Sequence, residues 1–165
     1  MKLRLTALIL ATAALIALAC SCGEKTPAYK TDIPVETLRA AAEVKLSNTE
    51  TFVTLDADYI EYMMELDSSA FAEGVVRWQA SGISADEFGI FKAVDEESAK
   101  TLGELLQKYL EKRIDTWNPS YDADQFPKIK NATVKVMGQY AVFCILSDAD
   151  REAVYSAVEN MLLGK

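Results

Sequence analysis

The sequence of 165 residues predicts an α+β domain with two layers, in which an antiparallel four-stranded sheet made of two hairpins has its helices packed on one face. Two observations support this fold class. Apolar residues recur at helical spacing in some segments and in strand-like patterns in others. The strand segments follow each other in pairs, which favours hairpins over a parallel, doubly wound sheet.

We expect the folded domain to span residues 34–164, beginning with two helices. Pro34 suits the first position of a helix, because its missing amide donor costs least there. An apolar stripe follows at helical spacing: Val35, Leu38, Ala42 and Leu46. After a short extended piece at 52–55, Asp56 is a typical cap for a brief second helix.

The first predicted hairpin comes next. Residues 75–80 alternate as a half-buried strand does, and residues 88–94 form a second extended, apolar segment. Because only the polar segment 81–87 separates them, we expect the two strands to be neighbours.

A long helix is predicted over residues 96–117. Its apolar stripe is made of Leu102, Leu105, Leu106, Tyr109, Ile114 and Trp117. Asn118 and Pro119 end it, and a polar loop is expected from Pro119 to Pro127.

The second hairpin and the last helix complete the fold. Residues 133–136 and 140–146 form the hairpin, and Gly138 in the turn between them can adopt a positive φ. The last helix begins at Ser147 or Asp148, and Gly164 is a typical terminator.

The first residues resemble a lipoprotein signal peptide. Lys2 and Arg4 precede an apolar run over 5–19, and a small residue stands before Cys20. The run is at the short end for a spanning helix. We therefore expect residues 1–19 to be removed and the mature chain to be anchored by acyl chains such as palmitate, on the extracytoplasmic side of a bacterial membrane.

Two cysteines compete for the lipid. Cleavage after Ala19 makes Cys20 the acylated amino terminus, whereas cleavage after Ser21 would leave Cys22 there. We favour Cys20 as the acylated residue, with Cys22 as the alternative. The simpler interpretation, which we do not favour, is an ordinary secretory signal that is cut near Ala19 without acylation. Residues 20–33 have no apolar period, so we expect them to be a flexible spacer.

Charge limits the partners. The formal charge is −8, and loss of Lys2 and Arg4 with the signal makes the mature chain −10. Such a domain repels phosphate backbones, which argues against nucleic acid as a partner. The membrane is then bound through the lipid, and the remaining candidate partners are an envelope protein or a glycan.

Catalysis has little support in the residues. The chain has no histidine, which removes the commonest general base and zinc ligand, and no cofactor motif is present. A pair of carboxylates could still hydrolyse a glycan. The candidates are Asp86, Glu87, Glu96 and Glu97, all of which we expect on polar turns or helix starts. We therefore expect no catalytic residue.

Three Asp-Ala-Asp sequences could be mistaken for calcium ligands. They begin at Asp56, Asp122 and Asp148, and none has the glycine and distal glutamate of an EF-hand loop. Two of them stand where helices are predicted to start, so capping explains them without a metal.

The remaining candidates are a cysteine and two aromatic residues. Cys144 lies in an apolar strand and has no histidine to activate it, so we expect a buried, unreactive thiol. Tyr121 and Phe126 fall outside any helix or strand period in the predicted loop. They are the candidate binding residues, because loops carry recognition more often than cores do.

Several phrases of the sequence resemble those of a known family. They are Leu55–Asp58, Ile83–Ala93, the hairpin from Val134 to Phe143, and Leu146–Asp150. The chain resembles the bacterial lipoproteins that carry domain of unknown function 4358, seen mostly in Gram-positive gut bacteria. The resemblance implies a lipid-anchored binding or envelope-associated module and implies no catalytic residue. The alternative is a small carboxylate-dependent hydrolase acting on cell-wall glycan.

Overall fold

The computed structural model describes residues 27–47, 49–80, 84–118, 120 and 122–165. One antiparallel sheet contains the strands β1 (Phe52–Thr54), β2 (Glu73–Gln79), β3 (Glu87–Lys92), β4 (Thr133–Met137) and β5 (Tyr140–Ile145), in the order β1-β2-β3-β5-β4. The α-helices are α2 (Val35–Glu43), α3 (Ala57–Tyr62), α4 (Glu96–Thr116), α5 (Phe126–Lys130) and α6 (Asp148–Leu163). No helix in these ranges is long and apolar enough to cross a membrane.

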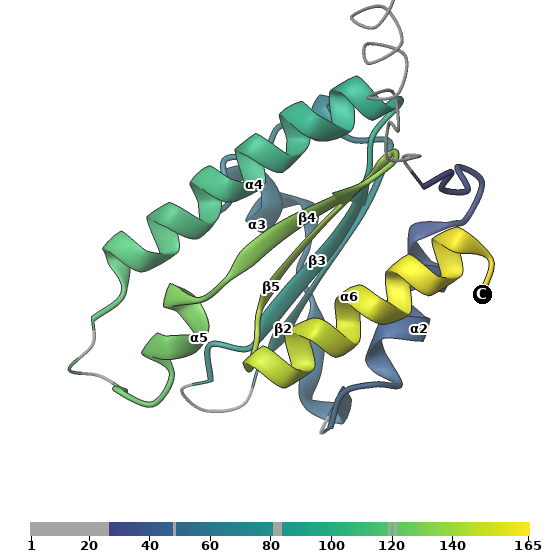
Figure 1. Cartoon of the computed structure of the whole chain (residues 1–165). Helices are drawn as coiled ribbons and strands as arrows, with labels where there is room; N and C mark the ends of the chain where they lie inside the picture. The colour runs from purple at the N-terminus through teal and green to yellow at the C-terminus, as the bar shows by residue number, and fades with distance from the viewer. Residues whose placement is uncertain (1–26, 48, 81–83, 119, 121) are drawn as a thin grey trace, which may run out of the picture.

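The fold class is confirmed, but two details of the predicted sheet are wrong. The sheet has five strands instead of four, because the short piece at 52–54 pairs with β2. Helices cover both faces instead of one: α4 lies on one side, and α2 and α6 lie on the other (Figure 1). The domain therefore has three layers.

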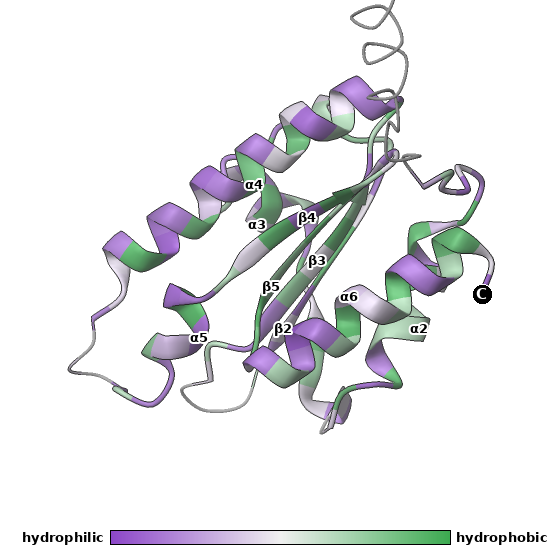
Figure 2. Ribbon diagram, in the orientation of Figure 1, coloured by the Kyte–Doolittle hydropathy of each residue, from purple (hydrophilic) through white to green (hydrophobic). Residues whose placement is uncertain are grey.

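Strand β5 explains why both faces are covered. All six of its residues are buried. Tyr140, Val142 and Cys144 belong to the apolar cluster beneath α2 and α6, whereas Ala141, Phe143 and Ile145 belong to the cluster beneath α4. A strand that is apolar on both faces needs a covering layer on each side. In Figure 2 the strands of the sheet are mainly green, whereas α4 and α6 combine purple and green segments.

Two glycines allow close contacts, one between α4 and the sheet and one between neighbouring strands. A Cβ atom added to Gly103 of α4 would lie 2.6 Å from a methyl carbon of Val136 in β4. A Cβ atom added to Gly89 of β3 would lie 2.3 Å from the Phe143 ring. Both glycines therefore allow close packing that a larger residue would prevent.

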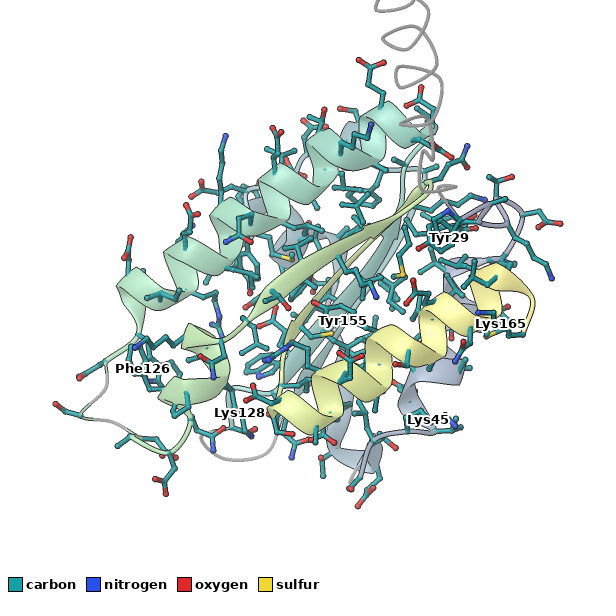
Figure 3. All side chains as sticks on the ribbon, viewed as in Figure 1. Tyr29, Lys45, Phe126, Lys128, Tyr155 and Lys165 are labelled. Carbon is teal, nitrogen blue, oxygen red and sulfur yellow. The ribbon has the colours of Figure 1, made fainter. Side chains whose placement is uncertain are left out.

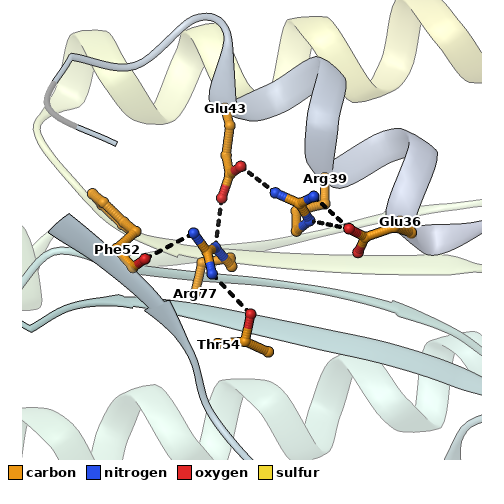
Figure 4. A network of polar contacts seen from close by, with 6 residues as sticks. All are labelled: Glu36, Arg39, Glu43, Phe52, Thr54 and Arg77. Carbon is orange, nitrogen blue, oxygen red and sulfur yellow. Dashed lines mark hydrogen bonds and ion pairs between the residues drawn. The ribbon is translucent and has the colours of Figure 1, made fainter. Parts of the chain in front are cut away.

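An arginine network fixes β1 and α2 to the sheet (Figure 4). Arg77 of β2 donates to a carboxylate oxygen of Glu43 at 2.5 Å, to the Thr54 hydroxyl at 2.8 Å and to the Phe52 carbonyl at 2.9 Å. Glu43 also pairs with Arg39, which pairs with Glu36. One guanidinium group thus links three elements of the fold.

Part of the expected spacer contacts the domain. The Lys30 amide donates to the Leu162 carbonyl at 2.9 Å, and the Tyr29 hydroxyl donates to Glu159 at 3.0 Å. The Tyr140 hydroxyl donates to the Ile33 carbonyl at 2.7 Å. Residues 29–33, which belong to the predicted spacer, are therefore tied to α6 and β5.

The predicted loop over 119–127 contains the start of a helix. Phe126 begins α5, in which Pro127 takes an early position and Ile129 is fully buried. Proline is compatible with the first turn of a helix. Pro127 therefore lies inside α5, whereas the sequence predicts that it is the last residue of a loop.

Candidate functional site

Two depressions lie at the end of the sheet where β5 stops and α6 begins. The first, of about 270 Å³, is lined by Asp124, Pro127, Lys128, Asn131, Leu146, Ser147 and Asp148. The second, of about 260 Å³, is lined by Leu46, Ser47, Phe52, Gln79, Asp86, Leu146 and Asp150. Leu146 contributes to both, so the two depressions are adjacent.

An ion pair connects the two depressions. The Lys128 ammonium group from α5 lies 2.6 Å from a carboxylate oxygen of Asp86, and the two side chains are only 23% and 24% exposed. Nearby, the Gln125 side chain accepts from the Ala85 amide at 3.1 Å. These two contacts hold α5 against the residues that precede β3.

The start of α6 supplies further polar groups. The Ser147 hydroxyl accepts from the Asp150 amide at 3.2 Å and donates to the Asp150 carboxylate at 2.7 Å. Asp148 pairs with Arg151 at 2.7 Å and remains mostly exposed. Serine is a preferred helix cap, and the following aspartates interact favourably with the helix dipole, which explains this local sequence.

Most of the charged side chains that line the site are hydrogen-bond acceptors. Four aspartates line the two depressions, Asp86, Asp124, Asp148 and Asp150, and Lys128 is the one basic lining residue that the described residues supply. Ionised carboxylates accept hydrogen bonds and do not donate them. The arrangement suits a ligand that offers hydroxyl or amino groups.

One of the two predicted binding residues, Phe126, precedes a residue that lines the first depression. Tyr121 is outside the described residues. Phe126 is half-buried and lines neither depression, although Pro127 and Lys128 line the first one. Figure 3 shows Lys128 on the side of α5 towards the start of α6. The predicted segment therefore borders the first depression, and its role in binding stays a prediction. Sequence reasoning did not single out Lys128, which is an ordinary charged residue in the sequence.

The predicted carboxylate candidates do not come together. Glu96 and Glu97 are exposed in the first turn of α4, behind the cap residue Asp95. Asp86 faces Lys128, whereas Glu87 is buried against α4 on the other face of the sheet. The expectation that Glu87 would lie on a polar turn is wrong, because it is the first residue of β3 and points into the α4 layer.

Glu87 lies in a polar cluster inside that layer. It is 1% exposed, the Tyr109 hydroxyl donates to it at 2.6 Å, and Arg113 lies 3.5 Å away. Burial raises the pKa of Glu87, and Arg113 and Tyr109 oppose that rise. Tyr109 and Arg113 stand four residues apart on one helix face, which was the only signal of this cluster in the sequence.

The aspartate motifs have local structural roles. Asp56 caps α3 by accepting from the Tyr59 amide at 2.8 Å, and Asp148 lies in the first turn of α6, as predicted. Asp122 accepts from the Asp124 amide at 3.0 Å in a turn. Within the part of the chain that the structure describes, no group of three or more His, Cys, Asp or Glu side chains is suited to a metal ion.

The cysteines separate into two cases. Cys144 is fully buried in β5, which confirms the predicted burial, and desolvation raises the pKa of its thiol well above the ordinary value. Cys20 and Cys22, the candidate lipidation sites, lie outside the described residues.

Comparison with known proteins gives one family. A family model described as a domain of unknown function (DUF4358) matches residues 45–146. The match includes the whole sheet and α4, and it leaves out α2 and α6. No curated protein and no solved structure matches the chain.

Proposed function

This chain belongs to the DUF4358 family, whose description assigns no activity, and on that premise we propose from its own residues that it is a lipid-anchored bacterial lipoprotein that binds a component of the cell envelope. The anchor is an acyl group on Cys20, or on Cys22 if cleavage occurs later. The domain works by recognition and not by turnover.

The pair of depressions beside the Asp86–Lys128 ion pair carries the recognition part of the proposal. Binding sites commonly combine a concave surface with a few convergent polar groups. Here the polar groups are mainly acceptors, so the ligand supplies donors. A glycan is rich in hydroxyl groups and fits that chemistry, and an envelope protein with a basic segment is the second candidate.

The hydrolase alternative is less well supported. Asp86 and Asp150 line one depression, but Asp86 pairs with Lys128 and Asp150 accepts from Ser147. A glycosidase needs a general acid with a raised pKa in the same cleft as its second carboxylate. Glu87, a carboxyl group whose pKa is raised, is buried on the opposite face beneath α4.

Intact mass tests the anchor. The mature protein should carry acyl mass, and Cys20→Ser should abolish acylation whereas Cys22→Ser should preserve it. If only Cys22→Ser abolishes acylation, the lipid is on Cys22. A mature chain without acyl mass would remove the anchor from the proposal.

Binding of soluble cell-wall glycan fragments tests the site. The double variant Asp124→Asn with Asp148→Asn removes two exposed carboxylates of the first depression, and we expect about a tenfold or greater loss of affinity, with at most the small fall in melting temperature that loss of the exposed Asp148–Arg151 pair causes. Glu96→Gln with Glu97→Gln makes the same charge change at the start of α4 and is the matched control. Equal affinities in the two variants would place the binding site elsewhere.

The neighbouring aromatic residues are tested separately. If the loop contributes to recognition, Tyr121→Ala with Phe126→Ala should weaken capture of the same fragments without changing the melting temperature.

The hydrolase alternative has a different readout. Release of cleaved fragments by the wild type, lost in Asp86→Asn or Asp150→Asn, would favour the hydrolase.

A further inference from the structure

The segment that joins the anchor to the domain is itself part of the folded structure. Tyr29 and Ile33 are half-buried, and the Lys30 amide bonds to the Leu162 carbonyl near the end of α6. The Tyr29 side chain also lies over the β4–β5 turn, where a Cβ atom on Gly138 would be 3.0 Å from the Cβ of Tyr29. The chain therefore enters the domain at a fixed place.

That place lies at one end of the sheet. The β4–β5 turn is tied to the start of α4, because the Ala93 amide donates to the Gln139 carbonyl at 2.9 Å and the Gln139 side chain donates to the Val94 carbonyl. We call this surface the anchor end. It includes Gln139, Val94, which is 70% exposed, and the last residues of α6.

The two depressions lie at the other end. Helix α4 runs from the anchor end towards α5, and its 21 residues span about 31 Å. In Figure 1 the segment from residue 27, in dark purple, joins beside the end of α6, whereas α5 and the start of α6 lie at the opposite end of the sheet.

The connection to the anchor is short. Nine Cα-to-Cα steps join Cys20 to Tyr29, so the two residues can be at most about 30 Å apart, and a flexible chain of that length averages roughly 15–18 Å. If residues 29–33 were released, the tether would gain about half its length again.

From these observations we propose that residues 29–33 are a docked mount, which turns the anchor end towards the lipid bilayer and holds the two depressions away from it. This inference rests on the proposed lipid anchor. The lipid bilayer lies next to the anchor end, because the connecting chain limits the distance between the acyl group and Tyr29. The depressions then face the envelope, where a ligand can reach them.

Quenching of a fluorophore by headgroup-labelled lipids tests the orientation. The full-length acylated protein is placed in phosphatidylcholine–phosphatidylglycerol vesicles with a probe on Gln139→Cys or on Asp124→Cys, and whichever of Cys20 and Cys22 is not acylated is replaced by serine. We expect several-fold stronger quenching at position 139. Equal quenching at the two positions, or stronger quenching at 124, would overturn the proposal.

Variants of the mount provide the matched comparison. Tyr29→Ala with Tyr140→Phe removes the ring over Gly138 and the bond to Ile33, and should bring the two quenching values together. Tyr29→Phe keeps the ring and loses only the hydroxyl bond to Glu159, so it should retain most of the difference. A difference that survives in the double variant would show that these residues do not set the orientation.

Amide exchange separates a failed mount from a failed anchor. The Lys30 amide should exchange slowly in the intact protein, because it donates to Leu162. Rapid exchange in an acylated protein would overturn the mount and leave the anchor intact. Slow exchange in a protein that carries no acyl group would refute the bilayer as the partner, although the docking itself would stand.

Discussion

At the scale of single residues, Glu87 is the clearest conflict between sequence position and environment. It follows a polar segment, yet its side chain shares one face of β3 with Gly89 and Phe91 and points towards α4. Burying a carboxylate costs several kcal/mol unless partners compensate for the lost water. Tyr109 and Arg113 compensate in part, and the net result is a raised pKa.

This raised pKa predicts a dependence of stability on pH. A group whose pKa is higher in the folded state binds more protons when folded, so its contribution is complete below the unfolded pKa and is lost as pH rises through the folded pKa. Glu87→Gln, which stays neutral, should therefore gain stability relative to the wild type as pH rises from about 4 to 8. The gain should be roughly 1.4 kcal/mol for each tenfold difference in proton affinity between the folded and unfolded states.

Thermal melts of both proteins across that pH range measure the difference. Asp95→Asn is a control of opposite sign, because hydrogen bonds from Ser98 lower the pKa of Asp95. The stabilising effect of the wild-type Asp95 carboxylate should be lost as pH falls below about 4 and through that lowered pKa, so melts of this control extend down to about pH 2. A gap between wild type and Glu87→Gln that does not change with pH would contradict the prediction.

Cys144 provides a second residue-scale prediction. Because burial raises the pKa of the thiol and excludes reagent, iodoacetamide should label Cys144 at neutral pH only as fast as the domain opens. Labelling should become rapid in denaturing urea. Native labelling as fast as that of a free thiol, in a protein with Cys20 and Cys22 replaced by serine, would be inconsistent with the structure.

At the scale of elements, Arg77 determines how the short strand β1 joins the sheet. β1 has three residues and supplies few ladder bonds, so the guanidinium bonds to Phe52 and Thr54 add a second attachment. The same group meets Glu43 of α2, which lies just outside the range of the family match. Arg77 therefore connects the part of the fold that the family model matches with the helix layer that lies outside the match.

Replacing this arginine should weaken both attachments. We expect Arg77→Met to lower the free energy of unfolding by about 1–3 kcal/mol, because Glu43 is left with Arg39 as its partner while the Phe52 carbonyl and the Thr54 hydroxyl lose the bonds from Arg77. Lys112→Ala breaks an exposed ion pair with Glu65 and should cost less than about 1 kcal/mol. Urea titrations compare the two, and similar losses would argue against a special role for Arg77.

At the scale of the whole molecule, the domain has two apolar layers of equal importance, one on each side of the sheet. Leu38 of α2 and Leu106 of α4 are fully buried in different layers. Leu38→Ala and Leu106→Ala should therefore each cost about 2–5 kcal/mol by denaturant unfolding. Val44→Ala, at a residue that is 77% exposed, should change stability by less than about 0.5 kcal/mol. A tolerated Leu38→Ala would indicate that the second layer contributes little.

The whole molecule should also be indifferent to calcium. Asp56 and Asp122 accept from helix or turn amides, and the third motif bonds to Ser147 and Arg151, so thermal melts with EDTA and with added calcium should superimpose. A ligand that binds only the folded state must raise the melting temperature. A rise of several degrees with calcium, and not with magnesium, would reveal a cation site.

Local signals account for the elements that the sequence predicts correctly. Asp56 and Ser147 cap helices through amides three residues away, and Gly138 and Gly164 take the positive φ that their turn and helix end require. The fold class and the burial of Cys144 followed from apolar periods in the same way. The lipid anchor is equally a local pattern, and it stays a prediction.

Features that depend on distant contacts became visible only in the folded chain. The continuous apolar run of β5 indicates burial on both faces, but which helices supply the two covering layers depends on how the whole chain packs. The attachment of β1 depends on Arg77, and the burial of Glu87 depends on Tyr109. The candidate site needs Asp86 and Lys128, which are 42 residues apart in the chain. Such pairs produce no periodic pattern in a sequence. The packing of whole elements brings the two side chains together, and neighbouring residues along the chain do not determine it.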